Sequence, residues 1–348
     1  MSDVVKWPAD VDEVIHGDLT AAAAYSTPAG GAVAVAVAPC GIGQREAGVL
    51  GFTTSLGFGK KLDRIIRDPH VALAYHAREH GFSANPAFVL AQGTASVDLT
   101  PSRDRLEALI PQAERYLGKV MRGPVWDRLL REYYGERVFV DIAVQRVAAW
   151  TDLSASGESR VSGPAWPGFP GSQSPPQNGT RPRVDVAKTA AQISGLPHRL
   201  LAYLGADGYP VIVPVQMAGH DESGLKLVVP DGLVPPGGRR AGLLAHAYRP
   251  QLVGLRTRIL TGWLEVTEDG ARYAPHTTKG FIAPPSKNLL LVSNGLLAKF
   301  GLWQARRRGI PERLERLASA STRTEEPAVP APGHPVQANL VPPGQSPG

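Results

Sequence analysis

The stretch best suited to chemistry is FTTSLGFGKKLDRIIRDP, which begins at residue 52. A predicted strand ends there in three consecutive hydroxyl side chains, Thr53, Thr54 and Ser55. A glycine-bearing loop follows, and Lys60 and Lys61 stand at the start of a predicted helix. Hydroxyls donate to phosphate oxygens, lysine adds a point charge, and a helix N-terminus offers free N–H groups. The turn is therefore a candidate anion site, and a solvated turn with capping hydroxyls is an equally open interpretation of the same residues.

Two other groups of residues could take part in chemistry. The run from His76 to His80 matches the H-x-x-E-H zinc pattern, but that pattern needs a helix, and here it follows a strand and precedes a glycine. We therefore predict a structural role for it and no metal site. Arg239 and Arg240 could reach an anion in the second part of the chain. The sequence contains no P-loop, no G-x-S-x-G elbow and no G-x-G-x-x-G between a strand and a helix, and it identifies no catalytic acid, base or nucleophile.

The first part of the chain is predicted to be rich in strands. Apolar runs place them at residues 32–37, 49–53, 71–75, 88–97 and 138–144. Helices are expected between the strands, one ending before Pro69, one opened by Thr100 and Pro101, and one containing Trp126 and Tyr133. Five or six antiparallel strands with short helices are typical of a small β-barrel and not of a doubly wound sheet.

The second part of the chain repeats this order. The matched segments are residues 203–215 with 25–37, 227–229 with 51–53, 241–246 with 69–74, and Gly262 and Val266 with Gly93 and Val97. Four matches in the same order predict a duplicated barrel. Prolines stand where the hydroxyl turn would be, and Arg239-Arg240 replaces Lys60-Lys61. The second copy is therefore predicted to have lost the anion site.

Composition divides the 348 residues further. Residues 154–184 and the chain from 316 onward are rich in Ser, Gly and Pro without apolar periodicity, so both are predicted to be disordered. The predicted domains are a first barrel at 1–153, a linker at 154–184, a degenerate second barrel at 185–315 and a tail at 316–348. A basic amphipathic stretch at 296–308 is predicted to pack its Leu, Phe and Trp face on its own domain.

Charge and cysteine content limit the protein's class. The net charge is +6, but its basic residues are spread along the chain, so we expect no nucleic-acid partner. A single cysteine, Cys40, excludes an internal disulfide. No apolar run approaches the ~18 residues of a membrane span, and acidic residues precede the longest run, unlike a secretory signal. We expect a soluble, cytoplasmic protein with a small-molecule substrate and no membrane partner.

Three motifs together carry a family resemblance. The run KLDRIIRDPHV from Lys61 to Val71 resembles the Lys, Asn/Arg-Leu/Ile-x-x-Asp-Pro-x-Val pattern of the pyridoxamine 5'-phosphate oxidase-like, flavin/deazaflavin oxidoreductase superfamily. RVFVDIAVQRVAAW, ending at Trp150, looks like that superfamily's terminal barrel strand, and Gly93-x-x-x-Val97 lies where its members have Gly-x-Ala-x-Val. The resemblance covers about residues 10–152, with a fainter echo over 190–270.

This resemblance implies a mainly β (α+β) fold of two tandem split β-barrels of the FMN-binding type with short helices. Such barrels usually dimerise, so a homodimer or an intramolecular pseudo-dimer is expected. Lys61 would hold the cofactor phosphate, Thr53, Thr54 and Ser55 would contact phosphate or ring, and Lys60 would assist. FMN is the expected cofactor and F420 the alternative, with haem third. The expected function is hydride transfer to or from a small organic substrate; the alternative is a non-catalytic flavin-, F420- or haem-binding protein.

Overall fold

A computed structural model describes residues 4–325 of the chain. Its first half is one antiparallel sheet in the order β2-β1-β5-β6-β7-β4-β3, with β8 added beside β7. The strands are β1 (Ala21–Ser26), β2 (Ala32–Val37), β3 (Gly43–Gln44), β4 (Val49–Ser55), β5 (His70–Tyr75), β6 (Phe88–Asp98), β7 (Arg137–Trp150) and β8 (Arg160–Ser162). All five predicted strands are present, and β1, β3 and β8 are additional.

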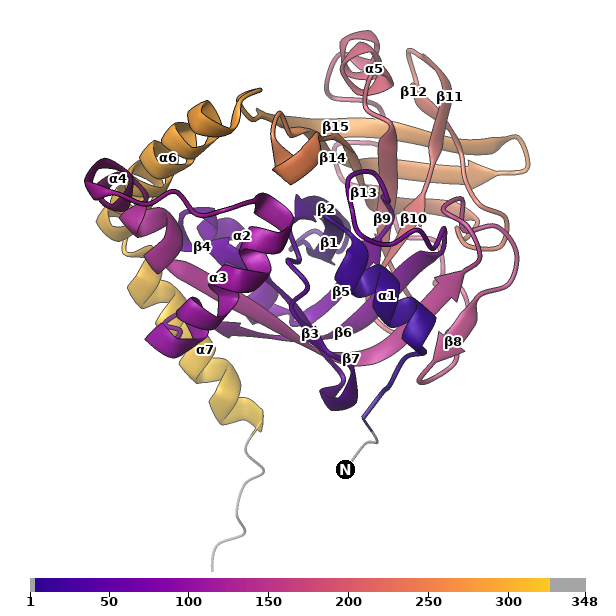
Figure 1. The fold of residues 1–348 in the computed structure, drawn as a ribbon. Coiled ribbons are helices and arrows are strands. Elements are labelled where there is room, and N and C mark those ends of the chain that lie inside the picture. The colour runs from indigo at the N-terminus through magenta and orange to yellow at the C-terminus, as the bar shows by residue number, and fades with distance from the viewer. Residues whose placement is uncertain (1–3, 326–348) are drawn as a thin grey trace, which may run out of the picture.

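The second half is a seven-stranded antiparallel sheet in the order β10-β9-β13-β14-β15-β12-β11, the same path as the first (Figure 1). Its strands are β9 (His198–Leu204), β10 (Pro210–Pro214), β11 (Gln216–Asp221), β12 (Gly224–Val228), β13 (Gly237–Ala247), β14 (Arg256–Thr267) and β15 (Gly270–Ile282). The prediction of a mainly β protein built from two duplicated halves is confirmed.

Strand register shows which residues correspond between the halves. Tyr25 pairs with Val33 as Tyr203 pairs with Val211, so residues 25–37 and 203–215 match as predicted. The ladder shifts at Gln92/Gly93 in the first sheet and at Thr261/Gly262 in the second, so each half carries a β-bulge at its equivalent glycine.

Two of the predicted matches were out of register. Leu50 pairs with Ile142 as Leu225 pairs with Tyr273, so residues 227–229 correspond to 52–54 and not to 51–53. Residues 241–246 correspond to 71–76, two positions later than predicted. Arg239 and Arg240 lie inside β13 and are not the counterparts of Lys60 and Lys61. Apolar alternation locates a strand but does not fix its register across loops of different length.

The helices connect strands or flank the sheets. They are α1 (Ala9–Gly17), α2 (Gly59–Arg67), α3 (Arg103–Leu117), α4 (Pro124–Gly135), α5 (Val186–Ser194), α6 (Lys287–Arg307) and α7 (Ile310–Glu325), with 3₁₀ turns η1 (Arg45–Ala47), η2 (Leu56–Phe58) and η3 (Pro250–Leu252). Helix α2 ends before Pro69 as predicted. Helix α3 begins later than predicted, because Ser102 and not Thr100 accepts the capping hydrogen bond, from the Arg105 N–H at 3.2 Å.

The two halves pack against each other through a face of small side chains in the first sheet. This alanine face consists of Ala22, Ala24, Ala32, Ala34, Ala72 and Ala74, all buried in a core shared with the second half. The second half contributes large residues such as Leu200, Leu244 and Leu260. A separate core lies within the first half and contains side chains of α1, α2 and the opposite strand faces.

The connection between the halves is structured, which corrects the prediction of a disordered linker at 154–184. It contains β8, which pairs with β7, and Trp166 packs against the shared core. The Gln173 N–H donates to the carbonyl of Gly238 at 2.8 Å. One tryptophan and these backbone hydrogen bonds fix a segment whose average composition is typical of disorder. The predicted tail from 316 is helical in α7 up to Glu325, and residues 326–348 lie outside the described chain.

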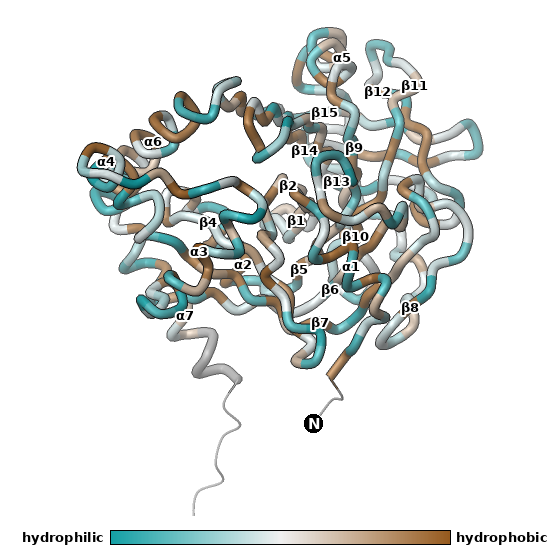
Figure 2. The backbone as a smooth tube through the Cα atoms, viewed as in Figure 1, coloured by the Kyte–Doolittle hydropathy of each residue, from teal (hydrophilic) through white to brown (hydrophobic). Residues whose placement is uncertain are grey.

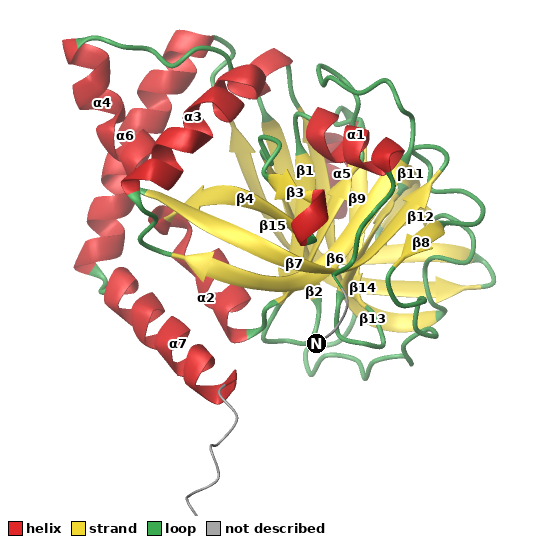
Figure 3. Cartoon of the chain, turned by 60° about the horizontal axis from the view of Figure 1, so that its bottom comes forward, coloured by secondary structure: helices red, strands yellow, loops and turns green. Residues whose placement is uncertain are grey.

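The C-terminal helices return to the first half instead of completing the second. Helix α6 contacts α4 and η2, and α7 contacts α2. Helices α2, α4, α6 and α7 therefore lie together at one side of the strands (Figure 3). The face of α6 predicted to pack is exposed: Phe300 is 59% and Trp303 52% accessible, and hydrophobic and hydrophilic residues alternate along the helix (Figure 2). Among the described helices, none is both long and apolar enough to cross a bilayer.

The close packing at the Gly93 bulge can be tested directly. A Cβ at Gly93 would lie 2.3 Å from the Ala143 carbonyl oxygen, whereas a Cβ at Gly135 would meet nothing within 4 Å. We expect Gly93→Ala to lower the free energy of unfolding by about 2–3 kcal/mol through overpacking, and Gly135→Ala to leave it within about 0.5 kcal/mol. Urea unfolding measures both; equal values would contradict the bulge assignment.

Candidate functional site

The hydroxyl–lysine turn, residues 53–61, joins β4 to α2 through η2. The Ser55 Oγ accepts a hydrogen bond from the Gly57 N–H at 3.2 Å and so caps η2. Ser55 therefore has the capping role that the alternative interpretation of this turn predicts. Its hydroxyl proton stays available as a donor, because the cap uses only an oxygen lone pair.

The three consecutive hydroxyls do not share one face. Successive strand side chains point to opposite sides, and the burial of β4 alternates accordingly from Phe52 onward. Thr54 is buried on the side of Phe52, while Thr53 and Ser55 are partly exposed on the other side. A single ligand on one face of β4 can therefore reach at most part of the predicted hydroxyl set.

Lys61 is the unusual group of the turn. Its Nζ lies 5.3 Å from the ring centroid of Phe52 and 5.2 Å from that of Phe58, so the ammonium group is held between two aromatic rings. Among residues 4–325, no carboxylate forms a salt bridge with it. Burial, together with the nearby Arg137 guanidinium, lowers the pKa of Lys61 to about 7. The two positive charges repel each other, and Lys61 is also half-buried. An anionic ligand would reduce both the repulsion and the cost of burying the Lys61 charge.

Lys60 points elsewhere, since neighbouring helical residues are about 100° apart. It lines a cavity of about 240 Å³ together with Arg64 and with Arg313 of α7. The structure therefore places Lys60 and Lys61 on different sides of α2, and it does not bring the predicted pair to one point.

The C-terminal helices cover the outside of the turn, which the sequence did not indicate. A Cβ at Gly57 would lie 3.5 Å from Gly301 of α6, and one at Gly59 would lie 2.7 Å from the Ile310 side chain. Ion pairs hold this cover in place, joining Arg306 to Glu136 at 3.0 Å and Arg313 to Asp63 at 2.8 Å.

A histidine cluster of His76, His198 and His246 lies between the halves. Ala74 pairs with Ala22 as Leu244 pairs with Leu200, so His76 and His246 occupy equivalent positions after β5 and within β13. Their Nε2 atoms are 2.6 Å apart. The hydrogen bond therefore joins the two halves at a pair of equivalent residues.

The tautomers of this pair follow from its surroundings. His76 Nδ1 lies 3.0 Å from the Ala74 carbonyl and must donate to it, so its Nε2 accepts the proton of His246 Nε2. His246 Nδ1 is then a bare acceptor, and within the described chain it is buried with no hydrogen-bond partner. Burial lowers the pKa of His76 to about 3 and also lowers that of His246. Both rings are neutral at physiological pH.

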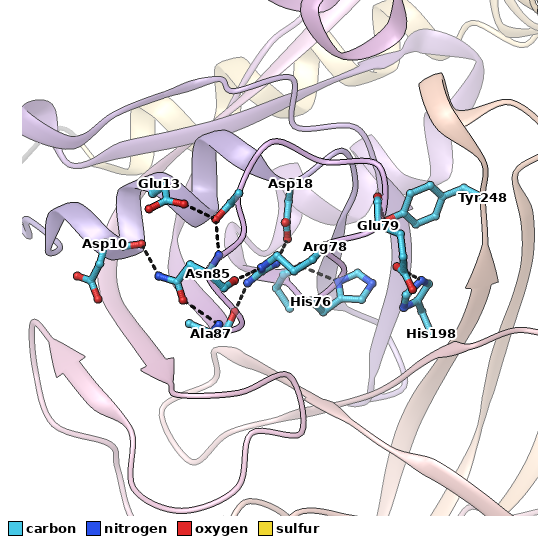
Figure 4. Close-up of polar contacts among 12 residues, drawn as sticks. Asp10, Glu13, Asp18, His76, Arg78, Glu79, Asn85, Ala87, His198 and Tyr248 are labelled. Carbon is cyan, nitrogen blue, oxygen red and sulfur yellow. Dashed lines mark hydrogen bonds and ion pairs between the residues drawn. The ribbon is translucent and has the colours of Figure 1, made fainter.

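His198 completes the cluster and borders open space. Its Nε2 lies 2.8 Å from a carboxylate oxygen of Glu79, and its ring stacks on Tyr248 at 5.6 Å (Figure 4). Burial lowers the pKa of His198, although Glu79 opposes the shift. His76, Glu79 and His198 line a cavity of about 500 Å³, the histidine pocket, whose other walls include Leu200 and Val215.

Arg78 fixes the loop that carries His76 and Glu79. Its guanidinium donates to the buried Asp18 carboxylate at 2.5 Å and to the carbonyls of Asn85 and Ala87 (Figure 4). Burial raises the pKa of Asp18 to about 7 despite this partner. The loop is therefore tied to the end of α1 and to the start of β6.

The histidine pocket is the second-half counterpart of the hydroxyl–lysine turn. In the register given above, Val228, Val229 and Pro230 correspond to Thr53, Thr54 and Ser55, and all three line the pocket. These three residues provide no side-chain hydroxyl donors.

The sequence could have indicated the histidine pair but did not. A two-residue error in aligning the repeats placed His246 opposite Ala74 instead of His76. Within the H-x-x-E-H run, His76 is buried against His246 while His80 is exposed at φ 62°, so the two histidines do not converge on one point. Within residues 4–325, no three His, Cys, Asp or Glu side chains are arranged to hold a metal ion.

No protein-family model matches the chain, and no curated protein matches it. The chain resembles solved structures from the protein group that its motifs indicated. They include a pyridoxamine 5'-phosphate oxidase-related, FMN-binding protein from Nostoc punctiforme PCC 73102 (11% identity, 60% of this chain and 96% of that chain, TM-score 0.30), an F420 reductase (16%, 40% and 98%, 0.30) and a haem-binding protein from Mycobacterium smegmatis (17%, 85% and 99%, 0.29). At this level of similarity, none of these matches assigns a cofactor or an activity to this chain.

Lys61 gives a stability test that needs no ligand. We expect Lys61→Met to raise the free energy of unfolding by about 1–2 kcal/mol at pH 7, because it removes a half-buried charge without a partner. The unfolded chain holds the Lys61 proton up to its ordinary pKa of 10.5, whereas the folded chain loses it near pH 7. The gain should therefore shrink as the pH rises from 7 towards 10.

Urea unfolding of wild type, Lys61→Met and Lys60→Met at pH 7 and pH 9.5 measures this effect. The exposed Lys60 serves as the matched control, and its substitution should change stability by less than about 0.5 kcal/mol. A loss of stability in Lys61→Met would contradict the assignment of Lys61 as an unfavourably buried cation.

Proposed function

We propose that the chain is an oxidoreductase that binds the phosphate of a flavin or deazaflavin at the hydroxyl–lysine turn. FMN is the first candidate and F420 the second. The observation that carries the proposal is Lys61, a half-buried cation with no carboxylate partner in the described chain. Structural lysines are rarely buried without a partner, so the position is best explained by an anion that is bound during function.

The residues of the turn fit this group in part. Lys61 would neutralise the phosphate, and Arg137 adds positive charge to the same region. Lys61 lies over Phe52, on the face of β4 that also holds the buried Thr54, whereas Thr53 and Ser55 point to the opposite face, so a phosphate at Lys61 would not also reach Thr53 and Ser55. The cofactor would supply hydride transfer, and the protein would hold, orient and desolvate it. Lys60 lies outside this set.

The pKa of Lys61 determines how cofactor binding should depend on pH. A bound phosphate favours the charged lysine and raises its pKa above the value of about 7 in the free protein. Binding therefore takes up a proton, and we expect FMN affinity to fall as the pH rises from 7 to 9, by up to about tenfold per unit. Lys61→Arg should remove most of this dependence, because arginine stays charged.

Titration of the full-length protein with FMN and F420 at pH 7 and 9, followed by fluorescence, tests the proposal. Lys61→Met should weaken binding at least tenfold at pH 7, and Lys188→Met, an exposed lysine of α5, should bind like wild type. Equal binding by Lys61→Met and wild type would refute the site. Bound FMN that is not reduced by NADPH faster than free FMN would favour the non-catalytic alternative.

Haem is a second candidate ligand, favoured by the histidine pocket. His198 is an imidazole with a lowered pKa, and it is oriented by a carboxylate, as metal-bound histidines commonly are. His198 would be the residue that holds the haem iron, which the porphyrin itself already binds. The cavity of about 500 Å³ with apolar walls is within the range of cofactor pockets.

We expect haemin titration to give a shifted Soret band in wild type that His198→Ala abolishes. His220→Ala, an exposed histidine in β11, is the matched control and should bind like wild type. Lys61→Met should leave the haemin titration unchanged, which separates the two candidate ligands. An identical Soret band in His198→Ala would exclude this histidine as the iron ligand.

A further inference from the structure

Helix α6 exposes large apolar side chains along one of its sides. The helix forms an edge of the molecule, running from the end of β15 past α4 (Figure 1). Residues of a helix are about 100° apart, so four of the exposed side chains fall within a sector of about 60°. We call this sector the apolar α6 face. Its members, each more than half exposed, are Leu289, Leu296, Phe300 and Trp303.

The other side of the same helix is apolar as well, and it is covered. Leu291 and Leu302 are buried there, and a Cβ at Gly295 would lie 2.7 Å from the Leu129 carbonyl oxygen of α4. A helix with apolar residues on more than one side is normally buried on more than one side. Within residues 4–325 only one of the two sides of α6 is covered. Exposed apolar patches of this kind mark contacts with a protein or a membrane.

The charges of α6 are all positive. From its first residue to Arg308, the helix has five basic residues and no acidic one. Lys299 and Arg306 turn towards α4 and pair there with glutamates at 3.9 and 3.0 Å. Arg307 and Arg308 are exposed, and no carboxylate of the described chain forms a salt bridge with either. The Arg307 guanidinium lies 4.8 Å from the ring centroid of Trp303, so free positive charge directly adjoins the apolar α6 face.

This combination distinguishes between the possible occupants of the face. A symmetric dimer would bring the face against its own copy, so cations would meet cations and neither α6 offers an acidic residue. A nucleic acid would need basic residues across the face, where leucines and aromatic residues stand. An anionic bilayer accepts both features, because apolar and aromatic side chains enter the boundary of the acyl chains while arginines remain at the lipid phosphates.

We propose that α6 binds the surface of a membrane rich in anionic lipid, with the apolar α6 face in the headgroup boundary and Arg307 and Arg308 at the phosphates. The helix would lie in the plane of the surface and not cross it. The expectation of no membrane partner assumed that this face packs on its own domain, and its exposure removes that assumption. The proposal does not depend on the cofactor proposed for either site above.

Sedimentation of the full chain with vesicles of phosphatidylcholine and phosphatidylglycerol in equal parts tests the proposal. We expect binding that weakens as the salt concentration rises, and at least tenfold weaker binding to phosphatidylcholine alone. Phe300→Ser combined with Trp303→Ser should weaken binding to the anionic vesicles at least tenfold, because it removes both rings from the face. Arg307→Gln combined with Arg308→Gln should weaken it at least fivefold.

Two matched controls separate the face from general effects of composition and charge. Phe169→Ser removes a phenylalanine that is 54% exposed in the connection between the halves. Arg181→Gln combined with Lys188→Gln removes two exposed positive charges at and before α5, so the net charge changes as in the double arginine variant of α6. Both controls should bind the anionic vesicles like wild type.

Thermal unfolding checks that each variant is folded. If Phe300→Ser with Trp303→Ser fails to fold, Leu296→Ser replaces it, since Leu296 is 57% exposed. No binding of wild type to the anionic vesicles, equal binding to phosphatidylcholine alone, or equal binding by the α6 variants and their controls would each overturn the proposal. A wild-type dimer that ignores vesicles and becomes monomeric in the double aromatic variant would overturn it in favour of a second copy of the chain. Lys61→Met and His198→Ala should bind vesicles like wild type, so failure here is distinguishable from failure of the cofactor proposals.

Discussion

The close approach of the two sheets is the constraint on which the rest of the structure depends. The alanine face of β1, β2 and β5 lets the second half come near enough that a Cβ at Gly242 would lie 2.7 Å from the Ala32 carbonyl oxygen. Larger side chains from the second half fill the space that these alanines leave. Such small-to-large complementarity is how cores reach high packing density. It also brings His76 and His246 to 2.6 Å, a contact that a wider spacing would not allow.

Duplication followed by unequal change explains why the halves carry different pockets. The first half keeps a helix after its fourth strand and places Lys61 at the start of that helix. The second half has apolar residues where the hydroxyls were and a loop where the helix was. The histidine pocket lies where the second half has Val228, Val229 and Pro230 in place of the hydroxyls. It is lined by residues from both halves, so it could not exist in a single copy.

Several buried polar groups lower the stability of the folded chain. Within the described chain, Arg239 Nε, Trp150 Nε1 and His246 Nδ1 have no hydrogen-bond partner, and no carboxylate forms a salt bridge with Lys61. A chain selected for stability alone would replace them by apolar residues.

The sequence by itself determined the strands, the duplication and the turn that holds Lys61, because alternating apolar residues and the order of turn signals are local properties. The correspondence between the strands of the two repeats could be predicted only in part, because loops of different length shift one repeat against the other. The resulting two-residue misalignment hid the equivalence of His76 and His246. Only the tertiary structure decided that Lys61 lies between Phe52 and Phe58, that Lys60 points away, and that α6 and α7 cover the turn. These depend on contacts between residues far apart in the chain. Composition also misjudged residues 154–184, because a single tryptophan packed against a distant core can order a segment that is otherwise rich in glycine and proline.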